Sequence, residues 1–484
     1  MTGLAGLPVF FELAALAGVR ESIQSNVCAR PGGQGWSDPS AILSLVLLNL
    51  AGGSCVDDID KLAGDSGLSA VLKQVEWAKM PRRARRDAER RWRKTQVRTV
   101  PSPSAMRRYL NHFHNAAEEQ KREKGTALIP AKLKPLIGLE RVNSDLIAFL
   151  QARRPATTAT LDQDATLVAS HKEEALLCYK KFRSYQPFNT WWAEQQVVVH
   201  SEFRDGNVPA GFEQLRMLTE SLSYLPESVK TVRLRSDTAG YQWDLLRYCE
   251  EGRNQRFGRI EFAVGVDITR GFKRAVHQTP GLTWHQLGTS EHEYAEVSFA
   301  PSQSCTTTRG EYRYIAVREP VRQMEMFKET QELSLPTLSQ SDADGNVQAW
   351  TLSAIVTNRI ELPAHEVIQW YRNRCGKSEE AHSIMKSDLA GGQLPSKYFG
   401  ANAAWWATMI LALNLVAVMK HLALPSSWMP RRMKAIRYWL INVPGQLVRR
   451  ARQLVLRLDP KHPSSSLLLE LRHRLGVLAT GPPG

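Results

Sequence analysis

The chain has 484 residues, enough for several domains, and 43% of them are hydrophobic, which excludes a largely disordered chain. Its 63 lysines and arginines outnumber its 48 acidic residues and give a formal charge of +15, which indicates a polyanionic partner. Six scattered cysteines exclude a disulfide scaffold and a zinc ribbon, and they fit a reducing cytoplasm.

Residues 1–125 predict a helical region with a basic arm. Apolar runs and a helix-start signal at Ser37 favour a small helical domain, and a helix-turn-helix is one form that it could take. The arm, residues 79–98, is rich in arginine and includes Arg82, Arg83, Arg85 and Arg86. These side chains either project into solvent or contact a phosphate backbone, and the overall charge favours phosphate contact.

From residue 157 the pattern changes to strands. Asp162 and Asp164 alternate with their neighbours, so both lie on one face of the first strand. A later strand, 231–236, ends at Asp237 and precedes a helix. A carboxylate at the end of a strand, before a turn and a helix, is where α/β proteins place active sites. Residues 155–255 therefore predict the first part of an α/β core.

Segment 256–347 predicts further strands joined by turns rich in Gly and Ser, which indicates a β-rich insertion. Trp284 lies in this segment and either packs in a core or stacks on a splayed base. The core resumes in residues 348–400, and residues 401–484 predict a helical, basic C-terminal region. The apolar run 403–419 predicts a buried helix, and we expect no membrane segment.

A helix beginning near residue 377 puts Glu379, His382 and Lys386 on one polar face, shortly after Tyr371 and Arg374. A carboxylate flanked by cations suits a site that binds both a metal ion and a polyanion. The alternative is a solvated amphipathic helix without a function. His382 is a further ligand, a nucleic-acid contact or a helix residue without a role.

Three acids from separate elements, Asp164, Asp237 and Glu379, form the predicted catalytic set. Two divalent cations held by carboxylates can activate a water and stabilise the leaving oxygen of a phosphodiester. Magnesium takes oxygen ligands and uses few carboxylates, so three acids suffice. Asp162 is the rival of Asp164 because it shares the same strand face.

The sequences around these acids resemble the motifs of bacterial DDE transposases. Asp164-Ala165-Thr166 and Arg235-Ser236-Asp237 resemble the first two acidic motifs, and the threonine after Asp164 favours it over Asp162. The third motif resembles the Tyr-Arg-Glu-Lys signature, with Tyr371, Arg374, Glu379 and Lys386. Two residues separate its tyrosine from its arginine and six separate its glutamate from its lysine, as in that group. Four residues separate Arg374 from Glu379, one more than in the commonest form.

Segments 374–376, 388–392 and 436–458 resemble the insertion sequence 1380 family, in which the longer gap also occurs, so the resemblance covers most of the chain. It implies a ribonuclease-H-like catalytic core interrupted by the β-rich insertion. It further implies that Asp164, Asp237 and Glu379 hold two Mg²⁺ ions, with Mn²⁺ as a substitute. By the same resemblance, Tyr371, Arg374 and Lys386 contact the DNA backbone beside the cleaved bond.

The resemblance implies a cut-and-paste transposase that hydrolyses the ends of a bacterial insertion sequence and transfers the 3′-hydroxyl into target DNA. Its partner would be double-stranded DNA, as terminal inverted repeats and as target. A homodimer or larger assembly would bind it in the cytoplasm, at the nucleoid and away from membranes. Two alternatives stay open: a catalytically silent, transposase-derived DNA-binding regulator, and a metal-dependent nuclease without strand transfer.

Overall fold

The N-terminal region is helical, as its sequence predicts. The computed structural model describes residues 1–30, 35–78, 80–95, 98–123, 125–301, 312–321, 337–341, 347–374, 377–450 and 453–480. The hydroxyl of Ser37 caps α3 by accepting a hydrogen bond from the backbone N–H of Ser40 at 3.3 Å. The basic arm forms the helix α6, and its residues 79, 96 and 97 lie outside the described residues. The helices are α1 (Leu7–Leu16), α2 (Val19–Asn26), α3 (Asp38–Ala51), α4 (Ile59–Gly64), α5 (Ser66–Ala78), α6 (Arg82–Thr95), α7 (Pro103–Asn111) and α8 (Ala116–Glu119).

A sheet of ten strands forms the centre of the described chain, and the fold is mixed α/β, as predicted. The strands follow the order β6-β5-β1-β7-β8-β13-β11-β10-β9, and β12 pairs with β13. The strands β1, β7 and β8 run parallel, and the other pairs are antiparallel. The bounds are β1 (Thr158–Ala165), β5 (Phe188–Trp192), β6 (Val197–Glu202), β7 (Thr231–Ser236), β8 (Glu261–Gly265), β9 (His285–Gln286), β10 (Glu293–Val297), β11 (Arg313–Pro320), β12 (Thr337–Ser341) and β13 (Val347–Thr357).

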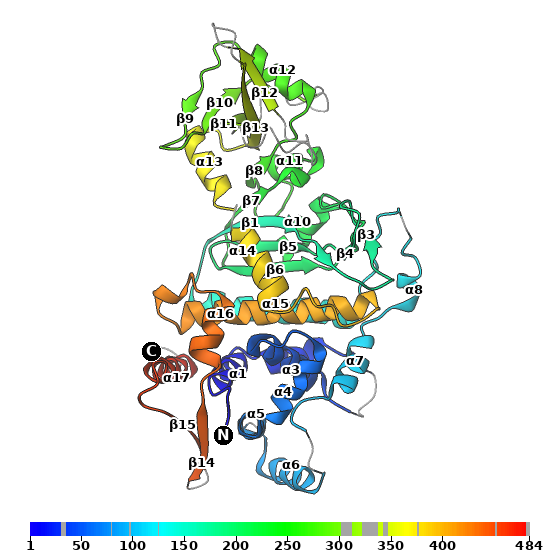
Figure 1. Cartoon of the computed structure of the whole chain (residues 1–484), viewed down its shortest axis with the longest axis vertical. Coiled ribbons are helices and arrows are strands. Elements are labelled where there is room, and N and C mark those ends of the chain that lie inside the picture. The colour runs from blue at the N-terminus through cyan, green and yellow to red at the C-terminus, as the bar shows by residue number, and fades with distance from the viewer. Residues whose placement is uncertain are drawn as a thin grey trace.

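The predicted β-rich segment 256–347 extends this same sheet. Its first strand, β8, pairs with β7. The helix α12 (Arg270–Gln278) follows, and then the strands β9 to β12, which join the sheet through β13. Figure 1 shows α12 and these outer strands at the top of the molecule, beyond α11 (Trp243–Glu250) and α13 (Ala364–Arg372). Since β8 is bonded to β7, the beginning of the segment belongs to the inner part of the sheet.

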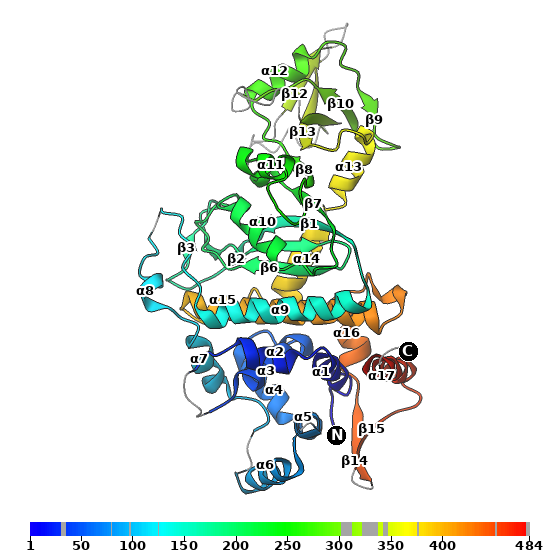
Figure 2. The ribbon, with the colours of Figure 1, turned by 180° about the vertical axis from the view of Figure 1, so that it is seen from behind.

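Two long helices separate the sheet from the N-terminal helices (Figures 1 and 2). They are α9 (Lys134–Arg153) and α15 (Phe399–Leu422). The amide nitrogen of Asn414 in α15 donates to the side-chain oxygen of Asn143 in α9 at 2.6 Å and to the carbonyl of Val198 in β6 at 2.8 Å. The carboxylate of Glu119 caps α15 by accepting from its first two backbone N–H groups at 2.9 and 2.8 Å. On the sheet, α10 (Gln214–Ser223) packs on β5 and β6.

The helix α15 contains the run 403–419, for which the sequence predicts a buried helix. By length and composition alone it is apolar enough to cross a membrane, but 94% of its most apolar window is buried inside the protein. Trp405 and Trp406 are fully buried, and their ring N–H groups donate to the carbonyl of Ala390 and the hydroxyl of Ser201. A helix that is apolar on all sides fits the core of a large protein.

The C-terminal region is only partly helical, which corrects the prediction of helices throughout residues 401–484. An antiparallel hairpin lies between its helices, where the basic residues were expected on a helix surface. Pro444 lacks a backbone N–H and disfavours a continuing helix, and the β-branched Val448 and Val455 that follow favour strands. The elements are α16 (Met433–Ile436), the π-helical turn η6 (Arg437–Ile441), β14 (Gly445–Arg450), β15 (Gln453–Leu458) and α17 (Ser465–Thr480).

Candidate active site

The first two predicted acids are neighbours at one edge of the sheet. In the parallel pair of β1 and β7, Gln163 lies opposite Ser236, and Asp164 and Asp237 come next on each chain. The carboxylate of Asp237 accepts a hydrogen bond from the backbone N–H of Ala239 at 3.1 Å, at the start of the 3-10 turn η2 (Thr238–Gly240). Burial raises the pKa of both carboxyl groups, and the charge of Asp164 raises the pKa of Asp237 further. The structure therefore brings these two acids together.

Asp162 is engaged by Arg235, its direct neighbour on β7. The guanidinium donates through Nε to one carboxylate oxygen at 2.5 Å and through Nη2 to the other at 2.7 Å, and through Nη1 to the carbonyl of Trp370 at 2.5 Å. The side chains of Arg235 and Asp162 are only 4% and 3% exposed. A carboxylate bound on both oxygens by a buried guanidinium has little capacity left for a metal ion. Asp162 therefore has a structural partner.

Arg374 reaches the aspartates from the chain that follows α13. It is buried, and its Nη1 donates to the carboxylate of Asp164 at 3.1 Å. Burial acts to lower the pKa of Arg374, but the charge of Asp164, together with Tyr371 and Asp237, raises that pKa overall. The guanidinium is therefore a fixed positive charge beside the two carboxylates.

The helix α14 (Lys377–Ser383) begins where the sequence predicts, and residues 375 and 376 before it lie outside the described residues. Glu379 is exposed near its start, and its charge acts on Asp164, adding to the effect of burial on the pKa of that carboxyl. Ala381 in this helix and Met385 just after it are buried. The third acid thus lies near enough to the first for its charge to act on that carboxyl group.

The predicted polar face of this helix continues through His382 and Lys386. Lys386 lies in the π-helical turn η4 (Ile384–Asp388), and its ammonium donates to the carbonyl of Leu167, just beyond β1, at 3.4 Å. Burial lowers the pKa of Lys386. Burial, followed by the charges of Lys386 and Arg374, lowers the pKa of His382 to about 4, so this imidazole is neutral at pH 7.

Tyr371, at the end of α13, meets the loop of Asp237 across a glycine. A Cβ atom built on Gly265, the last residue of β8, would lie 2.9 Å from the hydroxyl of Tyr371 and 3.0 Å from the backbone nitrogen of Thr238. It would also lie 3.2 Å from the carbonyl carbon of Asp237. Only a residue without a side chain fits here, so Gly265 allows Tyr371 to approach the second acid.

The end of the glutamate-bearing segment is tied to distant parts of the chain. The amide of Asn49 in α3 donates to the carbonyl of Leu389 at 2.6 Å. Arg437 in η6 donates to the carbonyl of Asp388 and, at 2.8 Å, to the carbonyl of Asn49. The carboxylate of Asp388 is buried and lies 3.4 Å from Nη2 of Arg432. The N-terminal and C-terminal regions therefore both help to hold this segment.

The remaining predicted residues lie apart from the acids. Trp284 is half-buried in the outer part of the sheet, and the guanidinium of Arg318 lies between its ring and that of Trp350, at 4.1 and 4.2 Å from the ring centroids. The exposed residues Arg82, Arg83, Arg85 and Arg86 lie on α6, at the opposite end of the molecule from α12 (Figures 1 and 2).

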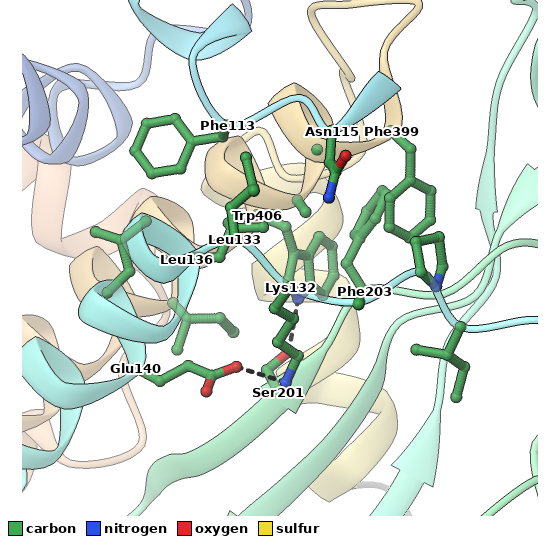
Figure 3. Close-up of a pocket in the computed structure, with 18 of the residues that line it drawn as sticks. Phe113, Asn115, Lys132, Leu133, Leu136, Glu140, Ser201, Phe203, Phe399 and Trp406 are labelled. Carbon is green, nitrogen blue, oxygen red and sulfur yellow. Dashed lines mark hydrogen bonds and ion pairs between the residues drawn. The ribbon is translucent and has the colours of Figure 1, made fainter. Parts of the chain in front are cut away.

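An apolar cavity of about 60 Å³ lies under β6, between α9 and α15, away from the acids (Figure 3). Phe113, Phe203 and Trp406 line it, and Lys132 at its rim pairs with Glu140 at 2.6 Å. This volume admits only a few water molecules, so the cavity is a packing gap and not a site for a nucleotide.

The donor chemistry at the sheet edge suits a hard divalent cation, because carboxylate oxygens are the ligands that Mg²⁺ prefers. Among the described residues, however, no three His, Cys, Asp or Glu side chains stand close enough to form one metal site. Asp164 and Asp237 adjoin, Glu379 acts on Asp164 through its charge, and Arg374 contacts Asp164. The carboxylate oxygens are therefore of the type that binds such a cation, and the guanidinium of Arg374 balances part of their negative charge.

The family model named Transposase DDE domain group 1 matches residues 4–480, almost the whole chain. The chain belongs to the DDE transposase family. A comparison with curated proteins found no match. Among solved structures, the chain is similar to a piggyBac transposase in a synaptic complex with hairpin DNA, at 10% sequence identity and a TM-score of 0.41. That similarity covers 98% of this chain and 84% of the other.

Sequence reasoning did not single out two residues that shape this transposase site, Arg235 and Gly265. For Arg235 the sequence shows only that strand alternation puts it on the same face as Asp237. Its position beside Asp162 follows from the parallel pairing of β1 with β7, which the sequence does not state. No local pattern marks Gly265, since its role depends on Tyr371 and Asp237, which are distant in sequence.

Proposed function

We propose that this transposase acts by cut-and-paste, hydrolysing the ends of its own insertion sequence and joining the freed 3′-hydroxyl to target DNA. The observation that supports the proposal most strongly is the meeting of Asp164, Asp237 and Arg374 at one sheet edge, with Glu379 acting on Asp164. A set of acids with adjacent cations is what a metal-dependent phosphodiester reaction needs. The mixed sheet, whose parallel strands lead into these acids, supports a ribonuclease-H-like core.

Asp164, Asp237 and Glu379 are the proposed ligands of two Mg²⁺ ions, with Mn²⁺ as a substitute. DDE transposases generally use divalent metal ions. Bound there, such ions would supply an activated water and stabilise the leaving oxygen. Asp164 is the proposed first ligand, because both oxygens of Asp162 are bound by Arg235.

The cations of the third motif are the proposed contacts of the DNA backbone. Arg374 lies 3.1 Å from Asp164, and Lys386 reaches the chain just beyond β1, so both flank the position of a phosphate near the acids. Tyr371 approaches Asp237 across Gly265, and it is the proposed residue that orients the same strand. His382, neutral at pH 7, is a candidate DNA contact beside them.

The proposed partner is double-stranded DNA, both the terminal inverted repeats and the target, bound by a homodimer or a larger assembly. The charge of +15 and the exposed arginines of α6 support a polyanionic partner. Trp284 is a weaker candidate for base stacking, because its ring already packs on Arg318. The proposed setting is the nucleoid in the cytoplasm of a bacterium, away from membranes.

A strand-transfer assay tests this proposal against the two alternatives. Purified protein, Mg²⁺, labelled DNA carrying the ends of the encoding element and a supercoiled target plasmid should give cleaved ends and joined products. Cleavage without joining would favour the nuclease. Binding without cleavage would favour the regulator. The absence of both binding and cleavage would contradict the proposed function.

A further inference from the structure

The hairpin of β14 and β15 presents two chemically different faces. Residues opposite each other in an antiparallel pair share a face, and residues two apart along a strand also share it. One face therefore carries Leu447, Leu454, Leu456 and Leu458, with Arg449 near the tip. These leucines line a cavity of about 350 Å³ together with residues of α1, α5 and α17, so this face is turned toward the protein.

The outer face has another composition. It consists of three cross-strand pairs: Gln446 with Arg457, Val448 with Val455, and Arg450 with Gln453. The arginines and glutamines are exposed, and the valines between them are half-buried. Within the described part of the chain, no carboxylate pairs with Arg450 or Arg457.

These side chains are of the types that recognise bases in the major groove of DNA. The major groove admits a two-stranded β-ribbon, in which arginine pairs with guanine, glutamine pairs with adenine and apolar groups contact the thymine methyl. A solvated hairpin needs no such pattern, and a ribbon that contacts only phosphates needs no glutamines or valines. The charges of the two exposed arginines suit a polyanionic partner such as DNA.

The base of the hairpin is fixed to the body of the protein. Thr2 and Gly445 exchange two backbone hydrogen bonds, both at 2.9 Å, and a methyl group of Leu447 closely approaches Gly67 in α5. Figures 1 and 2 show the hairpin at the same end of the molecule as α6, with its exposed arginines, and far from the acids. An anchored hairpin and an arginine-rich helix at the same end of the molecule are the two parts that a sequence-recognition unit needs.

We infer that the outer face of the β14–β15 hairpin reads base edges in the major groove of duplex DNA, while α6 contacts phosphates. The inference rests on the proposed function for its partner and adds a recognition site remote from the cleaved bond. Loss of one bidentate base contact should lower the preference for the recognised sequence about ten- to a hundredfold. Loss of an α6 arginine should weaken binding to all sequences alike and reduce the salt dependence.

The test is selection of binding sites from duplexes with a randomised central segment, using the full chain. The wild type should enrich a defined motif, and the double variant Arg450→Ala with Arg457→Ala should lose defined positions of it. Arg449→Ala is the matched control, because Arg449 is adjacent and exposed but on the other face; it should enrich the wild-type motif. Arg450→Lys keeps the positive charge but lacks the planar guanidinium that forms two hydrogen bonds with one base. This variant should bind random DNA as the wild type does and still lose the preference for the enriched motif.

Circular dichroism and the thermal midpoint verify that each variant is folded. A wild type that enriches no motif would overturn the inference. It would also be overturned if the Arg450→Ala and Arg457→Ala double variant, or Arg450→Lys, enriched the wild-type motif. A changed oligomeric state with an unchanged motif would also overturn it, because the face would then bind a second copy. These results are independent of cleavage, so a failure here is distinguishable from failure of the proposed function.

Discussion

Replacing Asp162 and replacing Asp164 should have opposite consequences, although the two residues share one strand face. In Asp162→Asn, the buried guanidinium of Arg235 loses its charged partner and one of its two bonds to that side chain. Breaking a buried ion pair costs about 3–5 kcal/mol, and the remaining amide oxygen puts this change near the lower end, about 3 kcal/mol. In Asp164→Asn, relief of repulsion from Asp237 offsets the loss of one bond to Arg374, so we expect about 1 kcal/mol or less.

The assay is urea unfolding of both variants, together with metal-dependent DNA cleavage at a urea concentration of zero. Asp162→Asn should unfold at clearly lower urea and retain cleavage while folded, whereas Asp164→Asn should unfold near the wild-type midpoint and lose cleavage. Joint replacement by Asp162→Leu and Arg235→Met should recover much of the lost stability, because an apolar pair leaves no buried charge unpaired. A stable Asp162→Asn protein without cleavage would refute the reasoning and make Asp162 the first metal ligand.

Two further predictions concern residues beside the acids, and a third concerns His421, a half-buried histidine near the end of α15. Gly265→Ala should reduce the rate of single-turnover cleavage about 100-fold, because the new Cβ pushes Tyr371 from its position. Gly271→Ala is the control and should cleave at the wild-type rate, because its new Cβ would meet no atom closer than 3.6 Å. Arg374→Gln should bind Mn²⁺ several-fold more tightly in the absence of DNA, because it removes the cation beside Asp164, and unchanged affinity by electron paramagnetic resonance would contradict this. Burial lowers the pKa of His421 to about 4, so as the pH falls from 6.5 to 4 the unfolded chain takes up the proton first and the stability of the folded chain falls. His421→Gln should therefore weaken the dependence of the urea midpoint on pH in that window. A dependence as steep as that of the wild type would contradict this prediction.

The strands that carry the acids could be predicted because their signals are local. Alternation around Asp164 and the turn after Asp237 mark the ends of β1 and β7, and the polar face of Glu379 marks α14. The pairing of β1 with β7 places the two aspartates side by side, but the sequence does not state which strands pair. The ion pair of Asp162 with Arg235 depends on that pairing, so it became visible only in the fold.

The C-terminal hairpin shows how a strong composition signal can mislead. The density of arginine and leucine after residue 431 favoured helices, since both residues are good helix formers. The leucines at every second position of Gln453–Leu458 and the β-branched Val448 and Val455 carried the correct information. The anchoring of Leu389 by Asn49 had no sequence signal at all, because it joins residues 340 positions apart.

The measurement that tests the central claim most directly compares wild-type protein with Glu379→Gln on DNA carrying the ends of the encoding element. Both proteins are incubated with and without Mg²⁺, binding is followed by anisotropy, and products are resolved on a denaturing gel. We predict Mg²⁺-dependent cleavage at the element boundary by the wild type only, with equal binding by both proteins. Cleavage retained by Glu379→Gln would contradict the assignment of Glu379 and, with it, the proposed three-acid site.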